Sequence, residues 1–530
     1  PMSSRIYHII VCCIVNGLTI SCASKSKQLY EPSKEEIQLT NTERVRLNDS
    51  LFLSGQNSLR KNAYGQWELV ATGDPLNLGN SIGTLSSELM AYQEKVFFNR
   101  MKEFVPSGFK RYMVKKYMIW YSREISNHIS DEYKTELYGL SRHASKNIKF
   151  EKDPYLRTLY LHGAHDLGHA LQDLALVGCT SFAAWGELTP DGDLLVARNL
   201  DFYVGDDFAK NKMIYFIQPE KGHAFMSVSW AGMIGVMSGM NVKGLTVTIN
   251  AGKSDIPSKA KTPVSLLARE ILQYAENIDE AIEIAKNREV FVSESILVGS
   301  AADNRAVVLE VSPENFGVFQ QNNVSRIICS NHFQSKVYEE DQNNRDQIEN
   351  SHSLYRFNRV EELLNQADVV TPEMAVGILR DRNGIKNKPL GYGNEKALNQ
   401  LLAHHGIVFQ PGKRRVWVSS NPYQLGDFVS YQLDEVFASK SMTEPSFSDE
   451  SLLIAKDTFL DSNAYKNYQM YRQTKNLIKK AIDHDEYLSE KDILYFKSLN
   501  SNYWELYFLI GKYYWNKKYY TAALNEFEKA

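Results

Sequence analysis

The sequence predicts an α+β protein whose C-terminal part is entirely helical. From about residue 85 to 176 apolar residues recur at three- and four-residue spacing, which is typical of amphipathic helices. From Cys179 the chain breaks into short runs rich in β-branched and aromatic residues, separated by turn residues. Strands and pairs of helices continue to about residue 440, and after 450 only helical patterns remain. A layered α+β unit followed by a helical extension accounts for this order.

The length and composition are those of a globular protein with more than one folded unit. The chain has 530 residues, of which 43% are hydrophobic and 23% charged, so two or three units with substantial cores are expected. The formal net charge of -3 is too small to suggest nucleic acid or another polyanion as a partner.

Residues 1–22 are predicted to be an export signal of the lipoprotein type. Arg5 precedes a short apolar run and then small residues before Cys22. The run is too short for a comfortable membrane span. Because "TISC" resembles a bacterial lipobox, we expect lipidation at Cys22 and a place in the bacterial periplasm or at the outer membrane. The alternative is ordinary cleavage nearby and free secretion. Residues 23–84 are predicted to be a polar tether and linker.

Residues 85–178 form the first predicted helical segment and carry three spaced histidines. His165 and His169 lie four residues apart on one helical face, with His162 a turn earlier, as in some metal sites. However, the zinc-protease motif has glutamate where this chain has Asp166, and no third ligand is evident. We therefore expect packing from these histidines, with a role at the cleavage junction or in the wall of an active site, or metal binding, as the alternatives.

Residues 179–440 are predicted to form the sheet-rich core, in which two helical regions separate groups of strands. The strand-like runs are "CTSFAAWGEL", "LLVARNLDF", "KMIYFIQ", "HAFMSVSW", "GVMSGMN", "GLTVTIN", "SILVGSA", "AVVLEVS", "SRIICSNHF", "RRVWVSS" and "FVSYQLDEVF".

Residues 450–530 are predicted to be helical and similar to a tetratricopeptide repeat. One repeat cannot bury its own apolar face, so this segment is expected to pack on neighbouring helices and to offer a surface to a protein partner. An ordinary helical hairpin is the alternative. The matching positions are Gly511, Tyr513, Tyr519, Ala522, Leu524, Phe527 and Ala530.

The cysteines single out Cys179. Cys12, Cys13 and Cys22 fall in the predicted signal, which leaves Cys179 and Cys329 for the exported chain. So few cysteines cannot form a disulfide scaffold. Cys329 lies in an apolar run and is expected in the core. Burial in the core is also the alternative for Cys179.

The segment after Cys179 predicts a hairpin that gathers three reactive groups. "TPDGD" is a strong turn signal, and folding about Asp191 places Asp201 opposite Ser181 and on the face of Cys179. In this register Arg198 has the wrong parity and needs a bend or bulge to reach the same face. The hairpin therefore predicts a thiol, a carboxylate and a guanidinium at one end of a sheet.

This group makes chemical sense if Cys179 becomes a chain terminus. No histidine lies near Cys179 in the hairpin to act as a base. An α-amino group has a pKa of about 7.7–8.0 and suits that role. Cutting the Gly178–Cys179 bond would place such an amine on the nucleophile's own residue, and the small Gly178 is what an N-to-S acyl shift at that bond requires.

These motifs resemble those of the autoproteolytic cysteine N-terminal nucleophile (Ntn) hydrolases. That superfamily includes penicillin acyltransferase-like enzymes, choloylglycine hydrolases and acid ceramidase-like amidases. "GCTSF" matches the cleavage site and nucleophile, and "RNLDF" matches the R-N-x-D segment. The resemblance implies cleavage between Gly178 and Cys179, polarisation of the thiol by Arg198, and retention of the new amine by Asp201.

Further segments extend the resemblance over roughly residues 90–440 and imply a four-layer αββα fold. "MNVKGLTVTIN" and "SNHF" place Asn250 and Asn331 where the superfamily has oxyanion-hole residues, and "SLYRFNR" places Arg356 at its late arginine. A strand-end asparagine or a surface arginine is the alternative for each of these positions.

The resemblance implies an autoproteolytically activated amidase that acts on a non-peptide N-acyl amide with an apolar or fatty acyl group. The long segment before Cys179 is closer to the acyltransferase and acid ceramidase-like branch, whose α and β chains stay associated after cleavage. Aromatic residues of 85–178 would line an acyl slot or pack on the sheet. No cofactor is expected, because the chemistry uses the chain's own amine and thiol. The alternatives are an acyltransferase, a bile salt or penicillin V acylase, and a degenerate lipoprotein that only binds a partner.

Overall fold

The computed structural model describes residues 30, 32, 39, 43–146, 153–170, 178–253, 259–321, 323–439 and 443–530, apart from the side chains of 165 and 167–170. The predicted signal with Cys22, and the side chains of His165 and His169, therefore lie outside the described residues. Within the described ranges, no helix has the length and apolar character needed to cross a membrane.

Two sheets form the centre of the molecule. One has eleven strands in the order β1-β2-β3-β4-β7-β8-β9-β10-β11-β12-β13, and the other has six in the order β14-β5-β6-β15-β16-β17. The strands are β1 (Val45–Asn48), β2 (Leu51–Ser54), β3 (Asn57–Lys61), β4 (Trp67–Gly73), β5 (Thr180–Ala184), β6 (Leu195–Leu200), β7 (Met213–Pro219), β8 (Phe225–Ser229), β9 (Ser238–Asn241), β10 (Leu245–Ala251), β11 (Glu294–Ser300), β12 (Arg305–Val311), β13 (Phe316–Phe319), β14 (Arg326–Cys329), β15 (His405–Gln410), β16 (Arg415–Ser419) and β17 (Phe428–Gln432).

The α-helices fall into three groups along the chain: before β5, between strands of the core, and after the core. They are α2 (Pro75–Phe104), α3 (Gly108–Tyr121), α4 (Asp131–Ser141), α5 (Pro154–Ala170), α6 (Val264–Tyr274), α7 (Ile278–Lys286), α8 (Gln342–Asn350), α9 (Ser353–Gln366), α10 (Pro372–Leu379), α11 (Leu433–Ala438), α12 (Asn463–Asp483), α13 (Glu490–Leu499), α14 (Trp504–Asn516) and α15 (Tyr520–Phe527).

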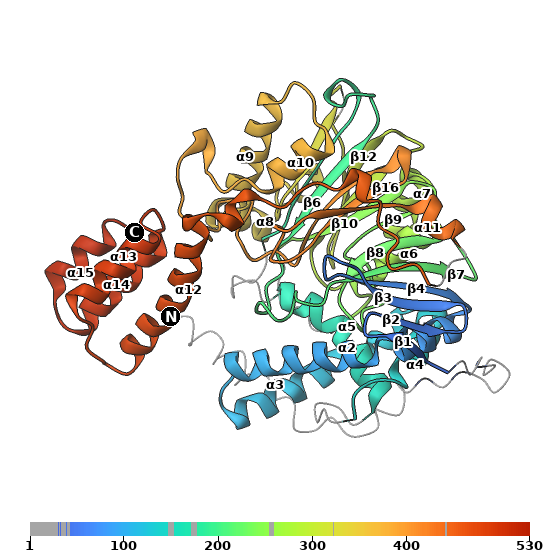
Figure 1. Ribbon diagram of the computed structural model, residues 1–530, viewed down its shortest axis with the longest axis horizontal. Helices are drawn as coiled ribbons and strands as arrows, with labels where there is room; N and C mark the ends of the chain where they lie inside the picture. The colour runs from blue at the N-terminus through green and yellow to red at the C-terminus, as the bar shows by residue number, and fades with distance from the viewer. Residues whose placement is uncertain are drawn as a thin grey trace.

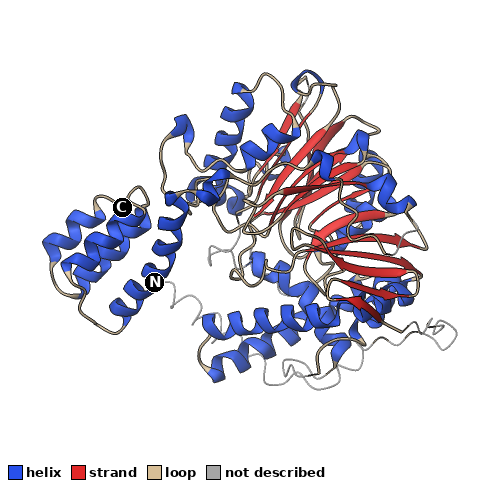
Figure 2. Ribbon diagram, viewed as in Figure 1, coloured by secondary structure: helices blue, strands red, loops and turns tan. Residues whose placement is uncertain are grey.

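The sheets and helices form four layers, as Figures 1 and 2 show. Between the two sheets lies an apolar core to which both contribute, for example Phe216 and Val308 from the larger sheet and Val196 and Phe409 from the smaller. Helices α2 and α4 to α7 pack on the outer face of the larger sheet, and α9 and α10 on that of the smaller. The predicted α+β, αββα fold class is confirmed.

The prediction of a tether over 23–84 is wrong for residues 45–73. This segment forms β1 to β4, which extend the larger sheet, and Leu59 and Leu69 are buried against the helical layer. Strand β4 pairs in parallel with β7, so its partner lies far along the chain. Helix α2 also begins at Pro75, where the Asp74 side chain caps it, ten residues before the predicted start.

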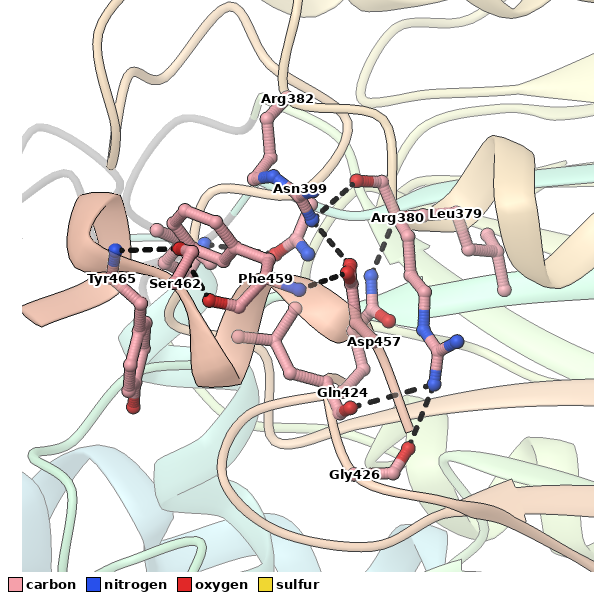
Figure 3. Close-up of polar contacts among 12 residues, drawn as sticks. Leu379, Arg380, Arg382, Asn399, Gln424, Gly426, Asp457, Phe459, Ser462 and Tyr465 are labelled. Atoms are coloured by element: carbon pink, nitrogen blue, oxygen red, sulfur yellow. Dashed lines mark hydrogen bonds and ion pairs between the residues drawn. The ribbon is translucent and has the colours of Figure 1, made fainter. Parts of the chain in front are cut away.

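The all-helical extension is confirmed, but it begins at Asn463 rather than at 450. Residues 443–461 return to the core, where Ile454 bonds with Phe428 at the edge of the smaller sheet. Figure 3 shows the junction, in which Arg382 pairs with Asp457 and Arg380 donates to the Gly426 carbonyl at 2.8 Å. The similarity to a tetratricopeptide repeat stays a prediction.

Candidate active site

Cys179 lies immediately before β5, and its side chain is fully buried. The observed register of the hairpin pairs Ser181 with Arg198 and Thr180 with Asn199, three residues away from the predicted one. A short 3-10 helix at Gly186–Leu188 occupies the connection and shifts the pairing. Arg198 therefore shares the face of Cys179 without a bulge, and the predicted bend is wrong.

The Arg198 guanidinium is held in the seam between the two sheets. Its Nη2 lies 3.7 Å from Cys179 Sγ and also donates to the Ile249 carbonyl. Nη1 donates to the Met237 carbonyl at 2.9 Å and to Ser238 Oγ. Burial raises the pKa of the Cys179 thiol, whereas the Arg198 charge lowers it. The uncut chain thus holds a protonated thiol beside a cation that favours the thiolate.

Asp201 follows the end of β6, and its backbone carbonyl accepts from the Gly178 N–H at 3.1 Å. Burial raises the pKa of its carboxyl to about 7, although Arg356 and Arg198 act in the opposite direction. Its Oδ1 has no hydrogen-bond partner among the described residues. The carboxyl is therefore placed beside the predicted cleavage junction with one oxygen able to accept a bond.

Gln400, which no motif marks, contacts both Gly178 at that junction and the Asp201 carboxyl. Its Nε2 donates to the Gly178 carbonyl at 2.9 Å and lies 3.5 Å from Asp201 Oδ2. A Cβ on residue 178 would lie 2.5 Å from this nitrogen, so the glycine allows the amide to approach. This contact explains in structural terms why residue 178 is a glycine.

The two predicted oxyanion residues join the two sheets near Cys179. Asn250 Nδ2 donates to the carbonyls of Cys329 and Ser330 at 2.9 and 3.2 Å, and its Oδ1 accepts from Ser181. Both of its amide hydrogens therefore have partners. Asn331 Nδ2 donates to the Ala251 carbonyl at 2.8 Å. The oxyanion roles stay predictions.

Arg356 lies on α9 and completes the polar group around Asp201. It donates to Asn331 Oδ1 at 2.7 Å and to the Glu395 carbonyl at 2.9 Å. Its charge lowers the pKa of Asp201. Cys329, expected in the core, is indeed buried between the sheets, and burial raises the pKa of its thiol to about 12.

A small pocket of about 60 Å³ has walls from both sides of the predicted cut. Met90 and Phe97 of α2 line it together with Phe202, Phe208 and Trp230. Phe202 directly follows Asp201, and its ring stacks on Trp230 with centroids 5.5 Å apart. A pocket of this volume has room for several water molecules.

His162 also lines the pocket and is fixed as a neutral ring. Its Nδ1 donates to the Thr158 carbonyl at 2.8 Å, and its Nε2 accepts from the Ile234 N–H at 3.1 Å. Burial lowers its pKa to about 4. Across the described ranges, no three or more His, Cys, Asp and Glu side chains gather as a metal site.

Two adjacent histidines, His404 and His405, extend the polar seam from Arg198. His405 Nε2 lies 2.9 Å from Ser238 Oγ, and the two Nδ1 atoms of the histidines are 2.9 Å apart. Arg198 donates to Ser238 Oγ, so a chain of polar contacts runs from the guanidinium through Ser238 and His405 to His404. The pair of histidines at the start of β15 is visible in the sequence, but it belongs to no motif of the resemblance.

Comparisons with known proteins agree with the resemblance. Residues 188–422 match the family model described as Acyl-coenzyme A:6-aminopenicillanic acid acyl-transferase. An uncharacterized protein of Archaeoglobus fulgidus is 25% identical over 279 residues, which cover 48% of this chain and 45% of that protein. The N-acylethanolamine-hydrolyzing acid amidase of Caenorhabditis elegans is 24% identical over 213 residues, which cover 38% of this chain and 57% of that protein.

Among solved structures, a mutant conjugated bile acid hydrolase from Clostridium perfringens is similar, with a TM-score of 0.34 and 15% identity. The match covers 53% of this chain and 96% of that one. The chain spans less than two thirds of the length of each curated relative named above. The family-model match and the curated relatives agree with the resemblance of the core to the Ntn hydrolases.

Proposed function

We propose that this chain, with its Ntn-hydrolase core, is a self-activated amidase that hydrolyses an N-acyl amide with an apolar acyl group. One observation carries the proposal: the Cys179 thiol lies 3.7 Å from Arg198 and near the buried Asp201 carboxyl, and Phe202, which follows Asp201, lines an aromatic pocket. The name of the C. elegans relative supports an N-acyl amide as the substrate.

Activation begins with attack of the Cys179 thiol on the Gly178 carbonyl. The C–N bond breaks and the thiol proton passes to the leaving nitrogen, which frees the Cys179 amine; hydrolysis of the thioester then regenerates the Cys179 thiol and leaves Gly178 as a carboxylate. Before this step the thiol is buried and its pKa is raised, which suits an inactive precursor. After it, the Asp201 carboxyl is placed to hold the ammonium form of the new terminus.

In turnover the amine takes the thiol proton, and the thiolate beside Arg198 attacks the amide carbonyl of the substrate. Asn250 and Asn331 stabilise the oxyanion, an effect worth about 2.7–4 kcal/mol per donor. Asn250 must exchange one of its carbonyl partners to do so. The amine product leaves, and water hydrolyses the acyl-enzyme.

The β4–β7 ladder supports the proposal that the two chains stay associated. Residues 45–73 lie before the cut and form four strands of the larger sheet. The parallel ladder pairs all of β4 with β7, which lies after the cut. Separating the chains would expose this sheet edge and the apolar face under α2. We also propose that the protein is exported and lipidated at Cys22. The helical extension is proposed to bind a protein partner.

Amides of one fluorogenic amine with acyl chains of increasing length test the function. We expect wild-type protein to release the amine, fastest with an apolar chain, and Cys179→Ala to release none. Adding a second amine and measuring a new amide separates a transferase from a hydrolase. A cut, folded wild-type protein that releases no amine from the series would contradict the proposed activity.

A further inference from the structure

The carbonyl group of Gly178, which activation has to attack, has a built hydrogen-bond donor. Gln400 Nε2 lies 2.9 Å from this oxygen, and Gln400 is only 5% exposed. Charge develops on that oxygen when the thiol attacks, and a donor already in place stabilises it without reorganisation. We propose that Gln400 is a catalytic residue of self-cleavage, the oxyanion donor to Gly178. The inference rests on the proposed self-activation and adds a residue to it.

The backbone around Gln400 holds this side chain in place under strain. Leu401 has a φ of 55°, a left-handed conformation that leucine rarely adopts. The Asn399 side chain stabilises it by accepting from the Leu401 N–H at 3.0 Å, and the Asn399 N–H donates to the Asp381 carbonyl at 2.8 Å. Strained, over-determined residues of this kind concentrate at functional sites.

Residue 178, which carries the acceptor, is also held in place. Its N–H, which belongs to the peptide unit before the scissile one, donates to the Asp201 carbonyl at 3.1 Å and anchors the residue beside Asp201. The absence of a Cβ at Gly178 allows the 2.9 Å contact, since a Cβ would lie 2.5 Å from Gln400 Nε2. Glycine at 178 and glutamine at 400 therefore form one complementary pair.

In the proposed step, Cys179 Sγ bonds to the Gly178 carbonyl carbon, and the carbonyl electron pair moves to the oxygen. Gln400 donates to that oxyanion. When the oxyanion collapses, the C–N bond breaks and the thiol proton ends on the Cys179 nitrogen. The products are a thioester and a free amine, and water then hydrolyses the thioester. No co-reactant other than water is needed.

The test follows conversion of the full chain into two chains by denaturing mass spectrometry over time. Gln400→Glu keeps the shape but presents an acceptor, and Gln400→Met keeps the length without a polar atom. Gln424→Met is the matched control, because Gln424 is also buried and donates to a backbone carbonyl, that of Leu379. We expect the Gln400 variants to convert about 100- to 1000-fold more slowly, and the control to convert like wild type.

Thermal unfolding and gel filtration of each variant separate slow chemistry from failed folding. A folded Gln400→Met chain that slowly yields the terminus Cys-Thr-Ser-Phe supports the inference. If the wild type is cut and both Gln400 variants are cut equally fast, the role of Gln400 is overturned, whereas the proposed self-activation stands. A wild type that is never cut contradicts the proposed self-activation, and the inference falls with it.

Discussion

Burial, rather than pairing with a cation, has the largest effect on the pKa of the Asp201 carboxyl. Its pKa is about 7 in the folded chain because it is buried, against an ordinary value of 3.8. The folded chain therefore keeps its proton where the unfolded chain has lost it. The free energy of unfolding consequently falls as the pH rises from about 4 to about 7, and this contribution is constant above that range.

Replacing Asp201 by Asn in a Cys179→Ala chain, which cannot cut itself, isolates this contribution. Between pH 4 and pH 8 we expect the Asp201→Asn chain to gain stability relative to its parent, by up to about 4 kcal/mol. Urea unfolding at a series of pH values measures the difference. A difference that does not change with pH would show that Asp201 titrates normally in the fold.

His405 is expected to act as a positioning residue through Ser238. His405→Asn removes the ring nitrogen that contacts the Ser238 hydroxyl, whereas His405→Gln restores a polar group near the position of Nε2. We expect His405→Asn to lower kcat about 10- to 100-fold with little change in KM, and His405→Gln to recover most of it. Equal losses in both variants would indicate a role in packing only.

Part of this site could be predicted from the sequence because its members are neighbours along the chain. Cys179, Arg198 and Asp201 fall within one hairpin, and the structure brings them together. The predicted pairing of the two hairpin strands was wrong because their connection contains a 3-10 helix that the turn signal does not reveal. Gln400 could not be predicted, since it reaches Gly178 from 222 positions away and its amide follows no motif.

The contact between α2 and α4 depends on glycines in both helices. A Cβ on Gly79 would lie 1.9 Å from the Glu136 carbonyl oxygen, and one on Gly139 would lie 2.4 Å from the Leu76 carbonyl oxygen. These helices belong to the chain that precedes the cut. The close approach therefore fixes the layer that supports both the larger sheet and the pocket.

Gly79→Ala tests this contact, with Gly377→Ala in α10 as the control. The first change forces the backbones apart and is expected to lower stability by about 1–3 kcal/mol. A Cβ on Gly377 meets nothing within 4 Å, so that change should raise stability by up to about 1 kcal/mol through helix propensity. Thermal or urea unfolding compares the two, and an unaffected Gly79→Ala chain would contradict the close contact.

At the scale of elements, the sequence predicted the helical layer before Cys179 and the strands after it. Strands β1 to β4 were missed because they are short and lie in a segment that begins with polar residues. The observed parallel pairing of β4 with β7 also depends on the folded core and leaves no local pattern. Tertiary pairing thus determined the structure where local propensity was weak.

The helical extension contacts the loop after β6 through Arg472 of α12. Its guanidinium donates to Tyr203 Oη and Asp206 Oδ1, each at 2.9 Å, and to Tyr423 Oη. Tyr203 and Asp206 belong to the loop that connects Asp201 and Phe202 with Phe208. The extension therefore stabilises the loop that carries part of the pocket wall.

Arg472→Met should loosen this loop without touching the reacting groups. We expect KM for a long-chain amide to rise about 3- to 10-fold, with kcat nearly unchanged, because the loss of such bonds weakens one wall of the pocket. Lys517→Met, which removes an ion pair with Asp485 within the extension, is the control. Equal KM values for Arg472→Met and the control would show that the extension does not influence the pocket.

The central claim concerns the Gly178–Cys179 bond, and the mass and N-terminal sequence of the purified protein test it most directly. The account predicts two chains in the wild type, the larger beginning Cys-Thr-Ser-Phe, and one uncut chain in Cys179→Ala. A folded wild-type chain that stays whole would contradict self-activation, and the protein would then be better described as a binding protein with an Ntn fold.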